Sequence, residues 1–257
     1  MNYENILVDQ EGAIAILTIA REKQLNALNK VTISELNNAL TVLESDQDVR
    51  VIIITGAGSK AFVAGADIKE FAHFNQEQGA ALSEKGQELL FDKIANYTKP
   101  IIAAINGFAL GGGLELAMSC HIRIASENAK MGLPELSLGL IPGYGGTQRL
   151  TQLIGKGLAL ELMLSSRMLT ADEALSCQLI NSVSTLDELL GNAKKIAQSI
   201  VKNSPVAVKK LLEAVRLGTD IQAGLKQEVR LFGECFGTED FKEGTTAFIE
   251  KRKPNFN

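Results

Sequence analysis

Short β-branched runs alternate with amphipathic helical patterns up to about residue 180, and this alternation restricts the fold more than any other feature of the chain. Runs such as AIAILTIA, bounded by turn residues, predict buried strands at 13–20, 51–55, 101–105 and 121–125. Apolar side chains spaced three and four residues apart predict helices at 34–43 and 80–96. Strands that alternate with helices are typical of the α/β class, which we therefore expect here.

The pattern changes after Pro205. Residues 206–236 carry one long helical pattern, and the charged stretch that ends at Pro254 predicts a final helix. The sequence therefore predicts two regions, a core at 1–190 that holds the active site and a helical region at 191–257.

The polar stretch 72–87 predicts a mobile loop or a loosely packed helix beside a site. His73 lies in this stretch, and we interpret it as a solvated loop residue rather than a catalyst.

The composition is that of a globular protein, because 46% of the 257 residues are hydrophobic and 22% are charged. A formal net charge of −4 and the lack of a basic stripe with interleaved aromatic residues argue against nucleic-acid binding. The start of the chain carries neither a basic nor an apolar leader segment, and no apolar run reaches the ~18 residues of a membrane span. Three widely spaced cysteines, Cys120, Cys177 and Cys235, form no CxxC pair. We therefore expect a protein of the reducing cytoplasm with no membrane partner.

The stretch VIIITGAGSKAFVAGAD formally matches part of the dinucleotide-binding fingerprint. That fingerprint needs a helix that opens directly on its glycines, and an acidic residue about 20 residues further on. Here more small residues and another glycine follow, and the acidic residue is absent. We therefore set the NAD-binding interpretation aside.

Two segments of small residues, AFVAGAD at 61–67 and ALGGGLELA at 109–117, expose their backbone. Residues without bulk let a ligand approach main-chain N–H groups closely, so two such segments together can aim two donors at one oxygen atom. A helix that begins after the glycines would add the positive end of its dipole. The alternative is that the glycines only allow a helix to pack tightly on a strand.

Two glutamates lie in apolar surroundings. Glu115 is flanked by apolar residues and has no basic partner within a helical turn, so its pKa is expected to rise, as a general acid or base requires. Glu135 follows Pro134 in a similar stretch, where it is either functional or a loop carboxylate that caps a backbone turn. Asp67 is interpreted as a cap on a short helix.

These residues belong to motifs that resemble the crotonase (enoyl-CoA hydratase/isomerase) superfamily nearly from end to end. The motifs are LNALN at 25–29, KAFVAGADIKEF at 60–71, INGFALGGGLELAMSCHIRIA at 105–125, MGLPELSLGLIPGYGGTQRL at 131–150 and EGTTAFIEKRKPNF at 243–256. The resemblance implies a spiral of ββα turns and a C-terminal helical trimerisation region, with homotrimers that often pair into homohexamers. Two residues depart from the pattern: Glu22 stands where many relatives have proline, and His121, interpreted as structural, stands where aspartate is common.

The resemblance also implies an activity. Both glutamate positions are occupied, as is typical of hydratases, so the implied reaction is reversible syn addition of water to a trans-2-enoyl-CoA to give a 3-hydroxyacyl-CoA. Glu115 would be the base and Glu135 the acid, and the N–H groups of Ala66 and Gly112 would hold the thioester oxygen. The alternatives are a 3,2-enoyl-CoA isomerase or another acyl-CoA enzyme of this fold, and a non-catalytic scaffold that binds RNA or protein.

For the CoA part of the substrate, the resemblance implies seven contact positions. They are Ala64, Asp67, Ile68, Lys69, Gly143, Phe232 and Lys251. Phe232 and Lys251 would reach CoA from the C-terminal region, in one reading that of a neighbouring subunit. CoA belongs to the substrate, so no cofactor is expected, and no residues with metal-ligand spacing are present in the sequence.

Overall fold

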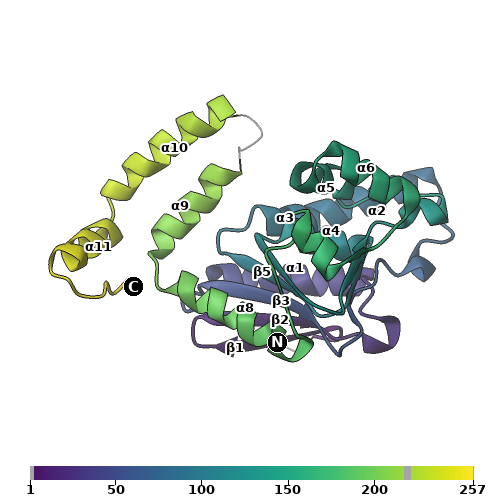
Figure 1. Ribbon diagram of the computed structural model, residues 1–257, viewed down its shortest axis with the longest axis horizontal. Helices are drawn as coiled ribbons and strands as arrows, with labels where there is room; N and C mark the ends of the chain where they lie inside the picture. The colour runs from purple at the N-terminus through teal and green to yellow at the C-terminus, as the bar shows by residue number, and fades with distance from the viewer. Residues whose placement is uncertain (1–2, 217–220, 257) are drawn as a thin grey trace.

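A computed structural model describes residues 3–216 and 221–256 (Figure 1). Its larger sheet has six strands in the order β1 (Ile6–Glu11), β2 (Ile14–Ile19), β3 (Val51–Gly56), β5 (Ile101–Ile105), β7 (Ile122–Ser126) and β10 (Ser182–Ser184). β1 pairs antiparallel with β2, and all other neighbours are parallel. The four strands predicted from β-branched runs are therefore confirmed as β2, β3, β5 and β7.

A smaller sheet contains β4 (Ala61–Val63), β6 (Phe108–Leu110), β8 (Lys130–Gly132) and β9 (Leu169–Thr170). Three consecutive strand pairs, β3–β4, β5–β6 and β7–β8, each place the first strand in the larger sheet and the second in the smaller one. This repetition is the spiral of ββα turns that the motifs imply, and the α/β prediction is confirmed.

The helices follow the spiral and then leave it. They are α1 (Lys30–Ser45), α2 (Gln76–Gly86), α3 (Asp92–Ala95), α4 (Gly112–Ser119), α5 (Gly146–Ile154), α6 (Lys156–Ser165), α7 (Ala171–Ser176), α8 (Leu186–Val201), α9 (Pro205–Val215), α10 (Ile221–Phe236) and α11 (Glu239–Ile249). Short 3-10 turns lie at Glu22–Gln24, Ile68–Glu70 and Glu135–Leu138, and a π-helical turn lies at Gln87–Phe91.

Two predicted elements, at 80–96 and 206–236, differ from the structure. The single helix predicted at 80–96 is interrupted, because a π-helical turn separates α2 from α3. The stretch 72–87 is mostly helix, the second of the two predicted alternatives, since the Asn75 and Gln78 side chains form a capping box that starts α2. The pattern at 206–236 forms two helices, α9 and α10, that pack against each other.

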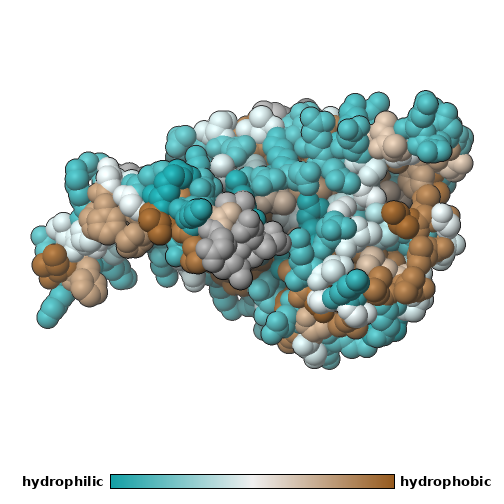
Figure 2. All heavy atoms as spheres, turned by 90° about the horizontal axis from the view of Figure 1, so that it is seen from above, coloured by the Kyte–Doolittle hydropathy of each residue, from teal (hydrophilic) through white to brown (hydrophobic). Residues whose placement is uncertain are grey.

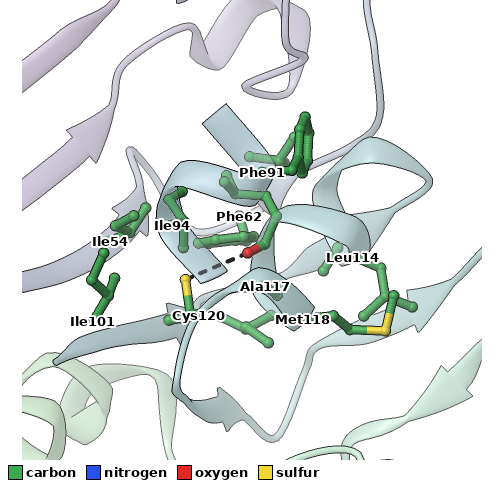
Figure 3. Packing of buried hydrophobic residues seen from close by; sticks show 14 of the residues in the cluster. Ile54, Phe62, Phe91, Ile94, Ile101, Leu114, Ala117, Met118 and Cys120 are labelled. Carbon is green, nitrogen blue, oxygen red and sulfur yellow. Dashed lines mark hydrogen bonds between the residues drawn. The ribbon is translucent and has the colours of Figure 1, made fainter. Parts of the chain in front are cut away.

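The core encloses α4 on every side. All eight residues of this helix are buried, and Figure 3 shows Phe62 of β4, Phe91 and Ile94 gathered around it. The Cys120 thiol donates a hydrogen bond to the Leu116 carbonyl oxygen at 3.4 Å (Figure 3). A side chain on α4 therefore has no route to bulk water except through a cavity.

Helices α9, α10 and α11 form an arm that lies apart from the sheets (Figure 1). Large apolar side chains are exposed on this arm, among them Val229 at 74%, Phe232 at 66% and Phe248 at 85%. Figure 2 shows the apolar side chains of the arm at the left of the view. Within the described residues, no helix combines the length and the apolar character needed to cross a membrane.

Candidate active site

A cavity of about 840 Å³ opens where the segment after β4, the start of α4, helix α2 and the loop between β8 and α5 meet. Seven of the predicted site residues line it: Ala64, Ala66, Ile68, Gly112, Glu115, Glu135 and Gly143. These residues come from segments that are far apart in the sequence. They meet because β4, β6 and β8 are parallel neighbours in the small sheet, so the C-terminal ends of these strands lie at one edge.

Two backbone N–H groups lie close together at the inner part of this cavity. Ala66 forms an isolated bridge with Leu28 that uses the N–H groups of Leu28 and Asp67, so the Ala66 N–H takes no part in it. Gly112 is the first residue of α4, and a first-turn N–H has no acceptor within its own helix. A Cβ atom on Gly112 would lie 3.7 Å from the Ala66 nitrogen. The two donors are therefore near enough to share one oxygen atom.

The three consecutive glycines have different roles. Gly111 has φ +50°, and a Cβ atom there would lie 2.9 Å from Glu135 Oε1. A Cβ atom on Gly113 would lie 1.9 Å from the Val63 carbonyl oxygen, so Gly113 lets α4 pack on β4. The packing interpretation is thus confirmed at Gly113, whereas Gly112 lies on the cavity wall with its backbone facing the cavity.

Glu115 lies in the first turn of α4 with only 1% of its surface exposed. Its Oε1 atom accepts hydrogen bonds from the backbone N–H groups of Tyr144, at 2.7 Å, and Gly146, at 2.8 Å. The pKa of Glu115 is raised from its usual 4.5 to about 7, chiefly by burial, with a smaller contribution from the charge of Glu135, while the two amide donors oppose the rise. This carboxyl group is thus able to take up or release a proton near neutral pH.

Glu135 begins the 3-10 turn Glu135–Leu138 and faces the same cavity. Its Oε2 atom is buried and has no hydrogen-bond partner among the residues that the structure describes. Burial raises the pKa of Glu135 above its usual value. One carboxyl group is therefore held by two donors, whereas the other has an oxygen atom that a bound proton or a ligand can satisfy.

The buried charge of Glu115 gives a testable pH dependence of stability. Because its pKa is about 7 in the folded chain and near 4.5 when unfolded, its stabilising contribution is complete below pH 4.5 and is lost as the pH rises through 7. The full loss corresponds to about 3 kcal/mol. In Glu115→Gln the amide oxygen can still accept both N–H donors, so we expect the variant to unfold at higher denaturant than the wild type at about pH 8 and at equal denaturant at about pH 4. Equal midpoints at both pH values would show that Glu115 is not ionised in a buried site.

Asp67 and Lys69 do not belong to the lining of this cavity. Asp67 occupies the N-cap position of the 3-10 turn Ile68–Glu70, as predicted, but its side chain makes no capping hydrogen bond. Its Oδ2 atom instead pairs with Arg21 Nη2 at 3.1 Å. A charged guanidinium forms a stronger hydrogen bond with a carboxylate than a neutral backbone N–H group does. Lys69 is exposed on the neighbouring 3-10 turn.

Phe232 and Lys251 lie on the C-terminal arm and line no part of this cavity in the described chain. Phe232 belongs to a separate apolar cavity of about 390 Å³ between α9 and α10, and Lys251 is exposed just after α11. A single chain therefore does not bring these two side chains to the glutamates.

The two histidines lie outside the cavity. His73 is exposed and contacts the Phe74 ring edge-on, with ring centroids 5.1 Å apart. His121 accepts the Ile101 N–H at Nδ1, at 3.0 Å, and burial lowers its pKa to about 4, so it is neutral and ties β7 to β5. In the part of the chain that the structure describes, no group of three or more His, Cys, Asp or Glu residues is arranged to hold a metal ion.

Tyr144 and Gly146 are residues of the site that the sequence interpretation missed. Their N–H groups hold Glu115, and a Cβ atom on Gly146 would lie 2.9 Å from Glu115 Oε1. The signal was present in PGYGG, where glycines surround an aromatic residue just before a helix. The contact between that segment and α4, which lies about 30 residues earlier, is seen only in the folded structure.

The sequence profile of the enoyl-CoA hydratase/isomerase family matches residues 9–257. The chain belongs to this family. A short-chain-enoyl-CoA hydratase from Clostridium acetobutylicum is 49% identical, with 98% of this chain and 97% of that protein covered. A crotonyl-CoA hydratase from Syntrophomonas wolfei is 47% identical over all of this chain and 99% of its own length.

Solved structures of enoyl-CoA hydratase/isomerase relatives show the same fold. The crystal structure of an enoyl-CoA hydratase from Bacillus anthracis has a TM-score of 0.92 at 41% identity, covering 98% of this chain and 99% of that chain. The resemblance to the crotonase superfamily and the expected architecture are thus confirmed.

Proposed function

We propose that this chain is an enoyl-CoA hydratase that catalyses the reversible syn addition of water to a trans-2-enoyl-CoA to give a 3-hydroxyacyl-CoA. The observation that carries the proposal is one cavity that holds two carboxyl groups of raised pKa beside two convergent backbone N–H donors. The names of the two hydratase relatives, each nearly half identical to this chain, support it.

In the proposed mechanism, the N–H groups of Ala66 and Gly112 bind the thioester oxygen, on which negative charge develops as water adds. Glu115 takes a proton from the water molecule as its oxygen atom forms a bond to the β-carbon. Glu135 gives its proton to the α-carbon, so one water molecule is added and the two carboxyl groups exchange protonation states. Proton transfer through solvent then restores them, and dehydration follows the same path in reverse.

The division of roles between the glutamates follows from their partners. Two N–H donors on Glu115 Oε1 stabilise the ionised form, as a base requires. The unpartnered Oε2 atom of Glu135 favours the protonated form, as an acid requires. Neither step calls for a resident metal ion or cofactor, since the backbone donors supply the electrostatic stabilisation.

The sharpest test is hydration of crotonyl-CoA, followed by the loss of the conjugated thioester absorbance. The wild-type protein is expected to turn it over, and Glu135→Gln to lower kcat by about 10²–10⁴-fold, since the amide has no acidic proton for the α-carbon. Glu127→Gln, at an exposed glutamate outside the cavity, serves as the matched control and retains full activity. No turnover by the wild type would overturn the proposal, and bond migration in a 3-enoyl-CoA without uptake of water would favour the isomerase alternative.

We also propose that the enzyme assembles into homotrimers, or hexamers made of two trimers, through the exposed apolar side chains of α9, α10 and α11. In such an assembly Phe232 and Lys251 of one subunit would reach the CoA bound to another. The cytoplasmic location stays a prediction, supported by three cysteines that are all free.

A further inference from the structure

Three aromatic side chains line the cavity, and they differ in depth. Phe74 is exposed and Phe71 is half-buried, whereas only 7% of Tyr144 is accessible. Phe71 and Phe74 therefore mark the side of the mouth, and Tyr144 forms part of the inner wall.

The Tyr144 ring is fixed by neighbours on three sides. It stacks on the Phe91 ring with centroids 4.5 Å apart and planes inclined by 9°. A Cβ atom on Gly86 would lie 2.3 Å from Tyr144 Cε1, so one edge of the ring occupies the space of a missing side chain. The opposite edge faces Gly112, whose Cβ atom would lie 3.5 Å from Tyr144 Cδ2. The ring thus fits between two glycines and cannot turn aside.

The backbone that carries this ring is fixed as well. The Ser83 hydroxyl and the Gln87 side-chain amide both donate to the Gly143 carbonyl oxygen. Arg149 Nη1 donates to the Tyr144 carbonyl oxygen at 2.7 Å. The wall is therefore preformed rather than assembled when a ligand binds.

The direction of a bound thioester follows from the size of CoA. The nucleotide and pantetheine are large and polar, so they must leave through the open mouth on one side of the carbonyl carbon. With the carbonyl oxygen at Gly112, the acyl chain extends from the opposite side of that carbon, toward the inner wall. The Tyr144 ring lies directly beside Gly112, so carbon atoms beyond the β-carbon meet this ring first.

We propose that Tyr144 is a specificity-determining residue whose fixed ring closes the acyl end of the cavity and restricts the enzyme to short acyl chains. This inference rests on the proposed hydratase function and adds to it the size of the acyl group. Removing the ring joins the cavity to the space between Gly86 and Phe91, where a longer chain finds an apolar surface.

The test compares kcat/KM for crotonyl-CoA and trans-2-decenoyl-CoA in the wild type, in Tyr144→Ala and in the matched variant Tyr144→Phe. Tyr144→Ala keeps the backbone N–H that binds Glu115 and removes only the wall. We expect the wild type to prefer crotonyl-CoA and Tyr144→Ala to lower that preference by about 10–200-fold, the scale on which hydrophobic pockets discriminate by size. Tyr144→Phe keeps the ring and hence the wild-type preference.

Two results would overturn the inference: a wild type without preference between the two substrates, or an unchanged preference in Tyr144→Ala. If Tyr144→Ala does not fold, Tyr144→Leu, which leaves a smaller apolar side chain on the same backbone, provides the same comparison. The affinities of the wild type and the variant for butyryl-CoA and decanoyl-CoA, measured by calorimetry, report on the wall without turnover. A chain that hydrates nothing but prefers butyryl-CoA in a Tyr144-dependent manner would contradict the hydratase proposal and retain this one.

Discussion

Replacing Glu115 by glutamine is expected to lower kcat for crotonyl-CoA hydration by about 10⁴-fold, the upper end of what a positioned acid or base contributes. The amide cannot take the proton of the attacking water molecule. Its oxygen atom can still accept the N–H groups of Tyr144 and Gly146, so the geometry around the position is retained. The loss is therefore chemical rather than structural.

The same substitution is expected to raise stability at alkaline pH, because it removes a buried charge. Steady-state kinetics and denaturant unfolding on one preparation measure both effects. Activity and stability that fall together would indicate that Glu115 has a structural role and would contradict its assignment as the base. Full activity in both Glu115→Gln and Glu135→Gln would show that neither carboxyl group takes part in the reaction. Lower activity together with higher stability is the result expected for a catalytic group that is buried at a cost in stability.

Local chemistry in the sequence was sufficient for four of the six strands of the larger sheet, β2, β3, β5 and β7, and for singling out both glutamates. β3 and β5 are fully or nearly fully buried parallel strands. Such strands consist of continuous β-branched residues, so each can be identified from its own sequence without knowledge of the strand that pairs with it. Glu115 stood out because a carboxylate among apolar residues is costly unless it has a purpose. In each case the decisive information lies within a few neighbouring residues.

Features that depend on contacts between distant segments could not be predicted in this way. The strands of the smaller sheet have only two or three residues each, too few for a periodicity to appear. The interruption of the helix after Gly86 coincides with the place where the Tyr144 ring, 58 positions later, takes up the space of a side chain. The donors that hold Glu115 are main-chain groups, which every residue but proline possesses and no sequence pattern marks.

Alanine substitutions at two adjacent glycines, Gly112 and Gly113, are expected to have different effects, one on activity and the other on stability. A Cβ atom on Gly112 meets its nearest neighbours at 3.5–3.7 Å, which is ordinary contact, so Gly112→Ala folds with its stability nearly unchanged. Its methyl group, however, lies 3.7 Å from the Ala66 nitrogen, where the thioester oxygen approaches in the proposed mechanism. We expect kcat to fall by about 10²–10³-fold, the cost of losing one oxyanion donor.

Gly113→Ala places its methyl group 1.9 Å from the Val63 carbonyl oxygen, a distance that only a shift of α4 away from β4 can relieve. We expect the free energy of unfolding to fall by at least about 1–3 kcal/mol, the usual cost of overpacking a core, with activity lost because Gly112 and Glu115 move with the helix. Thermal unfolding and kcat measured on both variants separate the two mechanisms. Full activity in Gly112→Ala would show that the Gly112 N–H does not bind the thioester oxygen. Unchanged stability in Gly113→Ala would show that α4 does not pack on β4 as closely as described. Because the two positions are adjacent on one helix, only their different neighbours can account for such a contrast: the proposed site of the substrate oxygen beside Gly112, and the Val63 carbonyl oxygen beside Gly113.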